Sequence, residues 1–160
     1  MYTDFSNLSQ ESKVWVYPSN RKFYPNEIDE VKSAVQSFVE EWKKDDPNFK
    51  ASFDFKYDRF VILAADDSES QLTTQDIDAS VAFIFELQTK FDVILIDKLN
   101  VCFKQGQFVQ YKDLKAFKKL IKQKSVSKKT IIFDNLVSNI ADYSEVWEIP
   151  ITESWYNRFF

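Results

Sequence analysis

The sequence predicts an α+β domain in which a mixed or antiparallel sheet is covered by about three helices. Short, continuously apolar runs alternate with longer segments whose apolar residues recur every three or four positions. The chain of 160 residues is 44% hydrophobic and 29% charged, as in ordinary globular proteins. No repeat, low-complexity segment or linker interrupts this pattern, so residues 1–160 are expected to form one domain.

The first strand and the first helix are expected between residues 14 and 44. Residues 14–17, VWVY, are apolar at every position, which predicts a strand buried on both faces with its aromatic rings in the core. Pro18 ends this strand, and Pro25 opens a helix at a position where its missing N–H costs nothing. The helix carries an apolar stripe at Ile28, Val31, Val35, Phe38 and Trp42.

Two strands and a second helix are expected over residues 50–91. The strands meet near Tyr57 and Asp58, and the continuously apolar residues 60–65 predict that the second of them is central. A polar loop follows, which is the best candidate for a mobile segment. Thr73 or Thr74 then caps a helix whose inner stripe is Ile77, Val81, Ile84, Leu87 and Phe91.

The rest of the chain is expected to add a short strand at residues 93–96, a hairpin that turns at Gln105 and Gly106, and a helix over residues 113–124. A last strand in TIIFDNLV and an aromatic tail in WEIPITESWYNRFF complete it. Through residue 96 the order is strand–helix–strand–strand–helix–strand, which is shared by ferredoxin-like folds. This order permits a ferredoxin-like core with the C-terminal elements added to it.

The composition excludes several classes of function. Without histidine, Ser-His-Asp and Cys-His catalysis and histidine metal sites are impossible. A single cysteine cannot form an internal disulfide, which fits a reducing cytoplasm, and a single glycine cannot build the glycine-rich loops that cradle nucleotide phosphates. No apolar run approaches the roughly 20 residues that span a bilayer, and no secretory signal is evident. We therefore expect a cytoplasmic protein without a membrane span.

The candidate ligand-binding residues lie near the starts of the first two helices. Four polar residues separate the first strand from the first helix: Ser19, Asn20, Arg21 and Lys22. A helix N-terminus attracts anions, and Arg21 can add a bidentate contact. Asp76 and Asp78 begin the second helix, beside the polar loop. The expected function is non-catalytic binding of a protein partner or a small anionic ligand, without a cofactor or a metal.

An alternative function uses aspartates. Asp66 and Asp97 each follow an apolar run, and convergent carboxylates can hold Mg²⁺ for phosphoryl transfer or hydrolysis. Aspartates at such positions are also common turn formers and helix caps. Cys102 lies within a strand-like run and is expected to be a small buried hydrophobe without reactivity.

A lysine-rich segment, residues 112–129, could bind a phosphate backbone or an acidic partner, or be the solvated face of an amphipathic helix. It holds one acid, Asp113, and eight lysines: Lys112, Lys115, Lys118, Lys119, Lys122, Lys124, Lys128 and Lys129. The segment lacks arginine and the isoelectric point is near 5.0, so nucleic acid is not an expected partner. The oligomeric state stays open.

Six stretches of the chain carry a resemblance to a known family: SKVWVYPSNRKF, KASFDFKYDRFVILAAD, DIDASVAFI, NVCFKQGQFVQYK, TIIFDNLV and SWYNRFF. They resemble a Bacteroidota family of proteins of similar length that is commonly labelled "ABC transporter ATPase". That label implies ATP hydrolysis, which requires phosphate-binding loops that one glycine cannot supply. Thr74 and Gln75 stand where many members carry Gly-Cys, and Tyr156 stands where they often carry His. The resemblance therefore transfers no functional residue to this chain.

Overall fold

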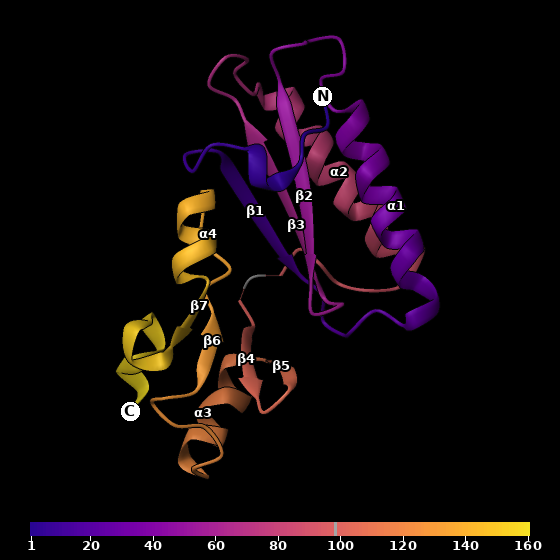
Figure 1. The fold of residues 1–160 in the computed structure, drawn as a ribbon. Coiled ribbons are helices and arrows are strands. Elements are labelled where there is room, and N and C mark those ends of the chain that lie inside the picture. The colour runs from indigo at the N-terminus through magenta and orange to yellow at the C-terminus, as the bar shows by residue number, and fades with distance from the viewer. Residues whose placement is uncertain (98) are drawn as a thin grey trace.

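The computed structural model describes residues 1–97 and 99–160 and confirms the α+β class (Figure 1). It holds two antiparallel sheets, with the strand orders β1-β3-β2 and β5-β4-β6-β7. The first sheet consists of β1 (Lys13–Pro18), β2 (Lys50–Lys56) and β3 (Phe60–Asp66). The second consists of β4 (Val101–Gln105), β5 (Phe108–Lys112), β6 (Ile131–Phe133) and β7 (Glu148–Pro150).

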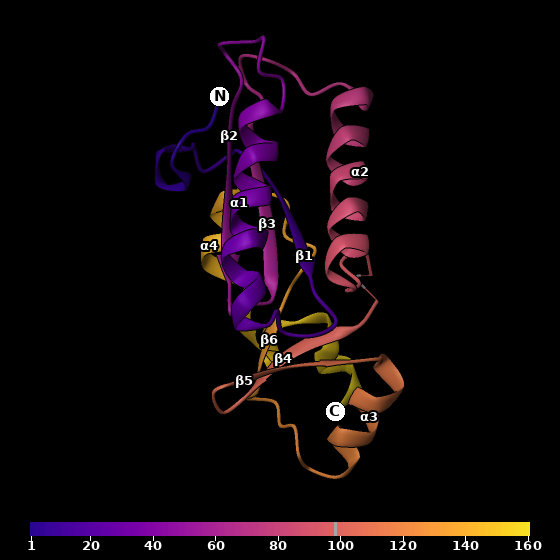
Figure 2. The same ribbon diagram turned by 90° about the vertical axis from the view of Figure 1, so that its right-hand side faces the viewer.

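Two long helices, α1 (Pro25–Glu41) and α2 (Thr74–Phe91), cover one face of the first sheet (Figure 2). The predicted stripe of α1 packs against Val61, Leu63 and Ala65 of β3. Of the stripe predicted for α2, Ile84, Leu87 and Phe91 join this core, whereas Ile77 is exposed. The helices also contact each other through the stacked rings of Phe38 and Phe83, whose centroids lie 4.5 Å apart. The predicted starts are confirmed, because Pro25 is the first residue of α1 and Thr73 caps α2.

The opposite face of the first sheet is also buried, as the apolar runs predict. Val14 and Val16 of β1 and Phe60, Ile62 and Ala64 of β3 point to this side. They pack against a short helix, α4 (Ile140–Val146), and against residues of the second sheet. Figures 1 and 2 place α4 on the face away from α1 and α2. The central strand β3 therefore contributes to two cores at once.

The second sheet has a core of its own with α3 (Leu114–Lys122) and the C-terminal 3₁₀ turns, residues 151–153 and 155–159. Phe103 and Ile132 meet Phe117 of α3 there. The predicted β4–β5 hairpin is confirmed, and Gly106 has a positive φ of 61° in its two-residue loop. No helix in the described part of the chain combines the length and the apolar character needed to cross a membrane.

The strand predicted at residues 93–96 does not form. The side-chain carbonyl of Gln88 accepts the N–H groups of Leu95 and Ile96 at 2.7 and 2.8 Å, and Asn20 Oδ1 accepts that of Ile94 at 2.9 Å. These side chains accept the backbone N–H groups that a strand would donate to a neighbouring strand. The first sheet consequently lacks the fourth strand of a ferredoxin-like sheet.

The last predicted strand is shorter than TIIFDNLV, and a helix follows it that the sequence did not indicate. Asp134 Oδ1 accepts the N–H of Leu136 at 3.1 Å, which turns the chain after Phe133. Asn139 Oδ1 then accepts the N–H of Asp142 at 2.7 Å and caps α4. Short side-chain turns thus replace the second half of the expected strand.

Candidate anion-binding site

The predicted loop at residues 19–22 is fixed to two distant segments. The N–H of Ser19, which is fully buried, donates to the carbonyl of Arg59 at 3.0 Å. Asn20 exchanges two hydrogen bonds with Ile94: its N–H donates to the carbonyl at 3.1 Å, and its Oδ1 accepts the N–H. Ser19 and Asn20 therefore hold the loop in place between the β2–β3 turn and the segment after α2.

Arg21 is occupied by an internal carboxylate. Its two Nη atoms lie 3.0 and 3.3 Å from the carboxylate oxygens of Glu27, and Nη2 donates to the carbonyl of Phe91 at 2.6 Å. Glu27 also accepts the N–H of Tyr24 at 2.8 Å, at the start of α1. The hydrogen bond from Arg21 is the main reason that the pKa of Glu27 is lowered. Glu27 thus takes the anion position that we expected a ligand to fill.

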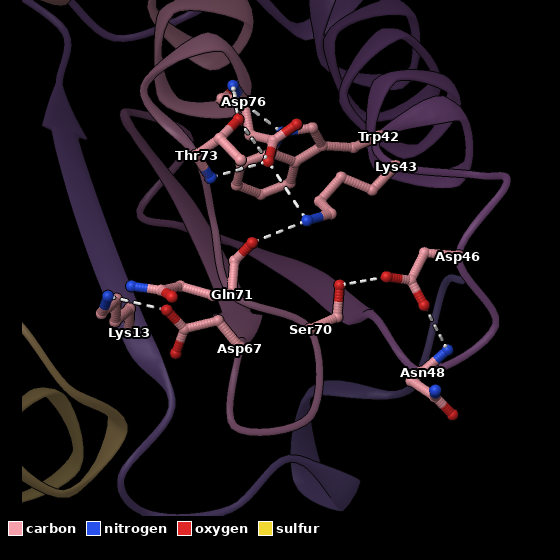
Figure 3. Close-up of polar contacts among 10 residues, drawn as sticks. All are labelled: Lys13, Trp42, Lys43, Asp46, Asn48, Asp67, Ser70, Gln71, Thr73 and Asp76. Carbon is pink, nitrogen blue, oxygen red and sulfur yellow. Dashed lines mark hydrogen bonds and ion pairs between the residues drawn. The ribbon is translucent and has the colours of Figure 1, made fainter.

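Asp76 and Asp78 lie at the other end of α2 from this loop. Asp76 caps the helix, with Oδ2 accepting the Thr73 N–H at 2.8 Å, and it pairs with Lys43 at 3.2 Å (Figure 3). Asp78, two residues further on, is exposed. A helix of 18 residues is about 27 Å long, so the two groups of predicted residues do not converge on one site.

The polar loop before α2 is anchored by side chains along its length (Figure 3). Asp67 pairs with Lys13 at 2.7 Å, and Ser70 donates a hydrogen bond to Asp46. The ammonium group of Lys43 donates to the carbonyl of Gln71 at 2.7 Å. Asp67, Asp46 and Lys43 thus serve as internal anchors of the loop.

Asp66 and Asp97, the residues of the alternative metal site, lie at opposite ends of the first sheet. Asp66 ends β3 and accepts two hydrogen bonds from Ser68. Asp97 follows the segment that contacts Asn20 beyond the other end of β1, and it accepts hydrogen bonds from Leu99 and Asn100. Both carboxylates shape local turns. Within residues 1–97 and 99–160, no three His, Cys, Asp or Glu side chains gather as a metal site.

A pocket of about 240 Å³ opens where three segments meet, and it contains Lys22 of the predicted loop. Residues 57–59, the turn between β2 and β3, form a second wall, and residues 107–109 of the β4–β5 hairpin form the third. The aromatic ring of Phe108 stands at this hairpin and is 72% exposed. Lys22 and Arg59 bring two positive charges to the pocket, and Asp58 brings one negative charge.

Arg59 is the unusual residue of this pocket. Its Nη1 atom is buried and has no hydrogen-bond partner among the described residues. Nor does its guanidinium form an ion pair in that part of the chain, although Asp58 is its neighbour in sequence. Burial is the main cause that lowers its pKa, and the two groups that oppose this shift, Cys102 and Tyr111, are neutral at pH 7. Burying a charge without a counterion lowers the stability of the folded protein. Buried polar groups are normally hydrogen-bonded, so the unpaired Nη1 atom of Arg59 needs an explanation.

The turn that carries Arg59 is conformationally strained and firmly held. Tyr57 and Asp58 adopt positive φ angles of 56° and 52°, in the left-handed region that costs a non-glycine residue about 1–2 kcal/mol. The carbonyl of Asp58 accepts the N–H of Phe23 at 2.8 Å, and the Tyr57 hydroxyl donates to Glu148 at 2.8 Å. Strain of this kind persists where the surroundings enforce it, commonly at binding sites.

Sequence reasoning identified Lys22 and missed Arg59. The available signal was a charged residue directly before the continuously buried strand β3, where a side chain must lie partly inside the molecule. The pocket is therefore lined by Lys22, which the sequence predicted, and by Arg59, which only the fold shows to be part of the same site. Comparisons of the chain with protein-family models, with curated proteins and with solved structures give no match.

Proposed function

We propose that this chain is a cytoplasmic binding protein that takes a small anionic ligand between Lys22 and Arg59. The observation that carries the proposal is the guanidinium of Arg59, which is buried at Nη1 and lacks a counterion among the described residues. An oxyanion in the pocket would supply the counterion that this guanidinium lacks. The free, buried thiol of Cys102 supports a reducing compartment.

The chemistry of the pocket favours a carboxylate or a phosphate group. A guanidinium presents paired N–H donors that match two oxygens of such a group, and a lysine ammonium adds a second charge-assisted hydrogen bond. A volume of about 240 Å³ corresponds to roughly eight water molecules. The ligand that fits is therefore a small molecule or one charged group of a larger one.

The lining residues support binding without catalysis. They supply no serine, cysteine or histidine that could act as a nucleophile. The hydroxyl of Tyr57 is already donated to Glu148, and burial is the main cause that raises its pKa. The strongest groups in the pocket are thus permanent cations, which hold an anion but do not transfer its protons.

The test compares Arg59→Met with Arg21→Met, because each substitution removes one guanidinium. Removing an unpaired buried charge costs little, so we expect Arg59→Met to unfold at the same or a higher denaturant concentration than the wild type. Arg21→Met should destabilise the protein, since it strands Glu27 and the carbonyl of Phe91. Guanidinium unfolding followed by circular dichroism measures both.

Ligand binding is measured on the same proteins by thermal shift. The probes are inorganic phosphate, pyrophosphate, citrate and benzoate, each against sodium chloride of equal ionic strength. A ligand at 100 times its Kd stabilises the native state by about 2.7 kcal/mol, and we expect such a rise in the wild type but not in Arg59→Met. The proposal fails if no probe raises the melting temperature, if Arg59→Met responds as the wild type does, or if Arg59→Met is as unstable as Arg21→Met.

A further inference from the structure

A second pocket lies between the end of β6 and the C-terminal turns, and the charge of its lining residues is opposite to that of the first pocket. Its volume is about 370 Å³. Ile132, Phe133 and Ile149 form its buried apolar floor, and two exposed apolar side chains flank it: Leu136, 73% exposed, and Trp155, 52% exposed. Exposed large apolar residues on both sides of a concave apolar surface are typical of a binding site.

The charges of this second pocket are negative. Asp134 and Glu153 line it, and no lysine or arginine of the described chain does. Asp134 Oδ1 accepts the N–H of Leu136, but neither carboxylate forms an ion pair with a described cation. Asp134 also contributes to raising the pKa of Tyr156, after burial and Cys102, which places its charge near the tyrosine ring. Two uncompensated carboxylates thus border an apolar cavity.

The aromatic wall of the pocket holds an internal cation on one of its rings. The guanidinium carbon of Arg158 lies 4.1 Å from the centroid of the Trp155 ring, so this indole already supports one positive charge by a cation–π contact. Trp155 and Tyr156 stand edge to face, with centroids 5.2 Å apart, which gives the wall a fixed shape.

From these features we infer that the second pocket binds a small organic ammonium ion that carries an apolar body. The apolar body would lie on Ile132, Phe133 and Ile149, and the ammonium group would lie between Asp134 and Glu153. This ligand class is opposite in charge to the one proposed for Lys22 and Arg59, so the two sites are tested independently.

The experiment titrates the ¹⁵N-labelled protein with phenethylamine and follows amide and indole N–H shifts. Two probes of the same shape serve as controls: 3-phenylpropanoate carries a negative charge, and 2-phenylethanol carries none. We expect phenethylamine to shift the signals of Leu136, Ser154 and the Trp155 indole, and to bind at least tenfold more tightly than either control. Equal binding of the three probes, or shifts confined to another surface, would overturn the inference.

The variant that removes the charge is Asp134→Asn combined with Glu153→Gln. Asparagine retains the Oδ1 acceptor for Leu136, so the turn is preserved. We expect the affinity for phenethylamine to fall at least tenfold, while Glu86→Gln, a neutralisation on the exposed side of α2, leaves it unchanged. Each single substitution is measured as well, so that misfolding of the double variant cannot mask the result. Unchanged affinity in both single variants would contradict the site.

Discussion

Cys102 is a thiol that the fold keeps protonated. It lies in β4 with 1% of its surface exposed, and burial raises its pKa to about 12. A contact with Asn135 and the charge of Arg59 oppose this shift without cancelling it. Because the thiolate is the reactive form, the residue is inert in the native protein. The sequence predicted a buried, unreactive thiol from the apolar neighbours of Cys102 and from the lack of histidine.

A pH series tests the state of this thiol. The pKa of Cys102 rises from 9.0 to about 12 on folding, so the stability linked to its proton is complete below pH 9 and is lost as the pH rises towards 12. We expect the difference in the free energy of unfolding between wild type and Cys102→Ala to fall by about 1.4 kcal/mol per pH unit above pH 9. Guanidinium unfolding between pH 7 and 10.5 measures it. A difference that does not vary with pH would contradict the burial of the thiol.

Among the elements, the start of α1 and the end of α2 are joined by one cluster of side chains. Arg21 connects Glu27 in the first turn of α1 to the carbonyl of Phe91 in the last turn of α2, and its guanidinium carbon lies 4.2 Å from the centroid of the Tyr24 ring. The carboxylate accepts the N–H of Tyr24, which caps α1, and the guanidinium donates to a C-terminal carbonyl of α2. This arrangement explains why the polar loop at residues 19–22 contains an arginine.

Glu27→Gln is the variant that tests this junction. The pKa of Glu27 lies below 4.5 in the folded protein, so its charge adds stability above that pH and loses it as the pH falls through the folded value. We expect a loss of about 1 kcal/mol at pH 7, since the pair is only partly buried, and a smaller loss at pH 3. Glu41→Gln, which breaks an exposed pair with Lys44, is the control and should change little at either pH. Equal losses for Glu27→Gln at both values would exclude an electrostatic origin.

The elements that the sequence predicted are those defined by local periodicity. The stripes of α1 and α3, the C-terminal part of the α2 stripe and the apolar run of β3 appear in the fold because each pattern is set by its own spacing. Residues 93–96 have a strand-like composition, but the side chains of Gln88 and Asn20 bind their backbone. Contacts from other parts of the chain therefore decide this segment, and local sequence cannot reveal them.

The whole molecule is held together where the two sheets meet. Phe60 of β3, Phe133 of β6 and Trp147 form a triangle of rings with centroids 4.8 to 5.0 Å apart. The hydroxyl of Tyr143 in α4 donates to Asp54 of β2 at 2.9 Å. This junction buries the face of the first sheet that the long helices leave open, so the two sheets stabilise each other.

Two tryptophans provide a matched test of this junction. Trp147 is 3% exposed in the centre of the contact, whereas Trp155 lies at the surface. We expect Trp147→Ala to lower the free energy of unfolding by about 3–5 kcal/mol, as for a large buried ring, and Trp155→Ala to lower it far less. Chemical unfolding monitored by far-ultraviolet circular dichroism gives both values. Similar losses for the two variants would show that the sheets do not depend on each other.

The candidate site shows the limit of sequence reasoning at this scale. Lys22 was selected because it precedes a helix, and it does line the pocket. Its partner Arg59 and the rim residue Phe108 come from turns far along the chain. Residue patterns report which side chains prefer burial, but the lack of a counterion beside Arg59 becomes visible only when its neighbours are known.

The continuously apolar strand β3 has a consequence for the chain before it folds. Residues 60–65 contain no charge, proline or glycine, and such a hexapeptide is prone to form intermolecular β-structure when it is exposed. Arg59 on one side and Asp66 and Asp67 on the other act as gatekeepers that oppose this association. We therefore expect Arg59 to protect nascent chains from association, in addition to lining the pocket. Loss of its charge should lower the yield of soluble protein during expression even where the folded state is not weakened.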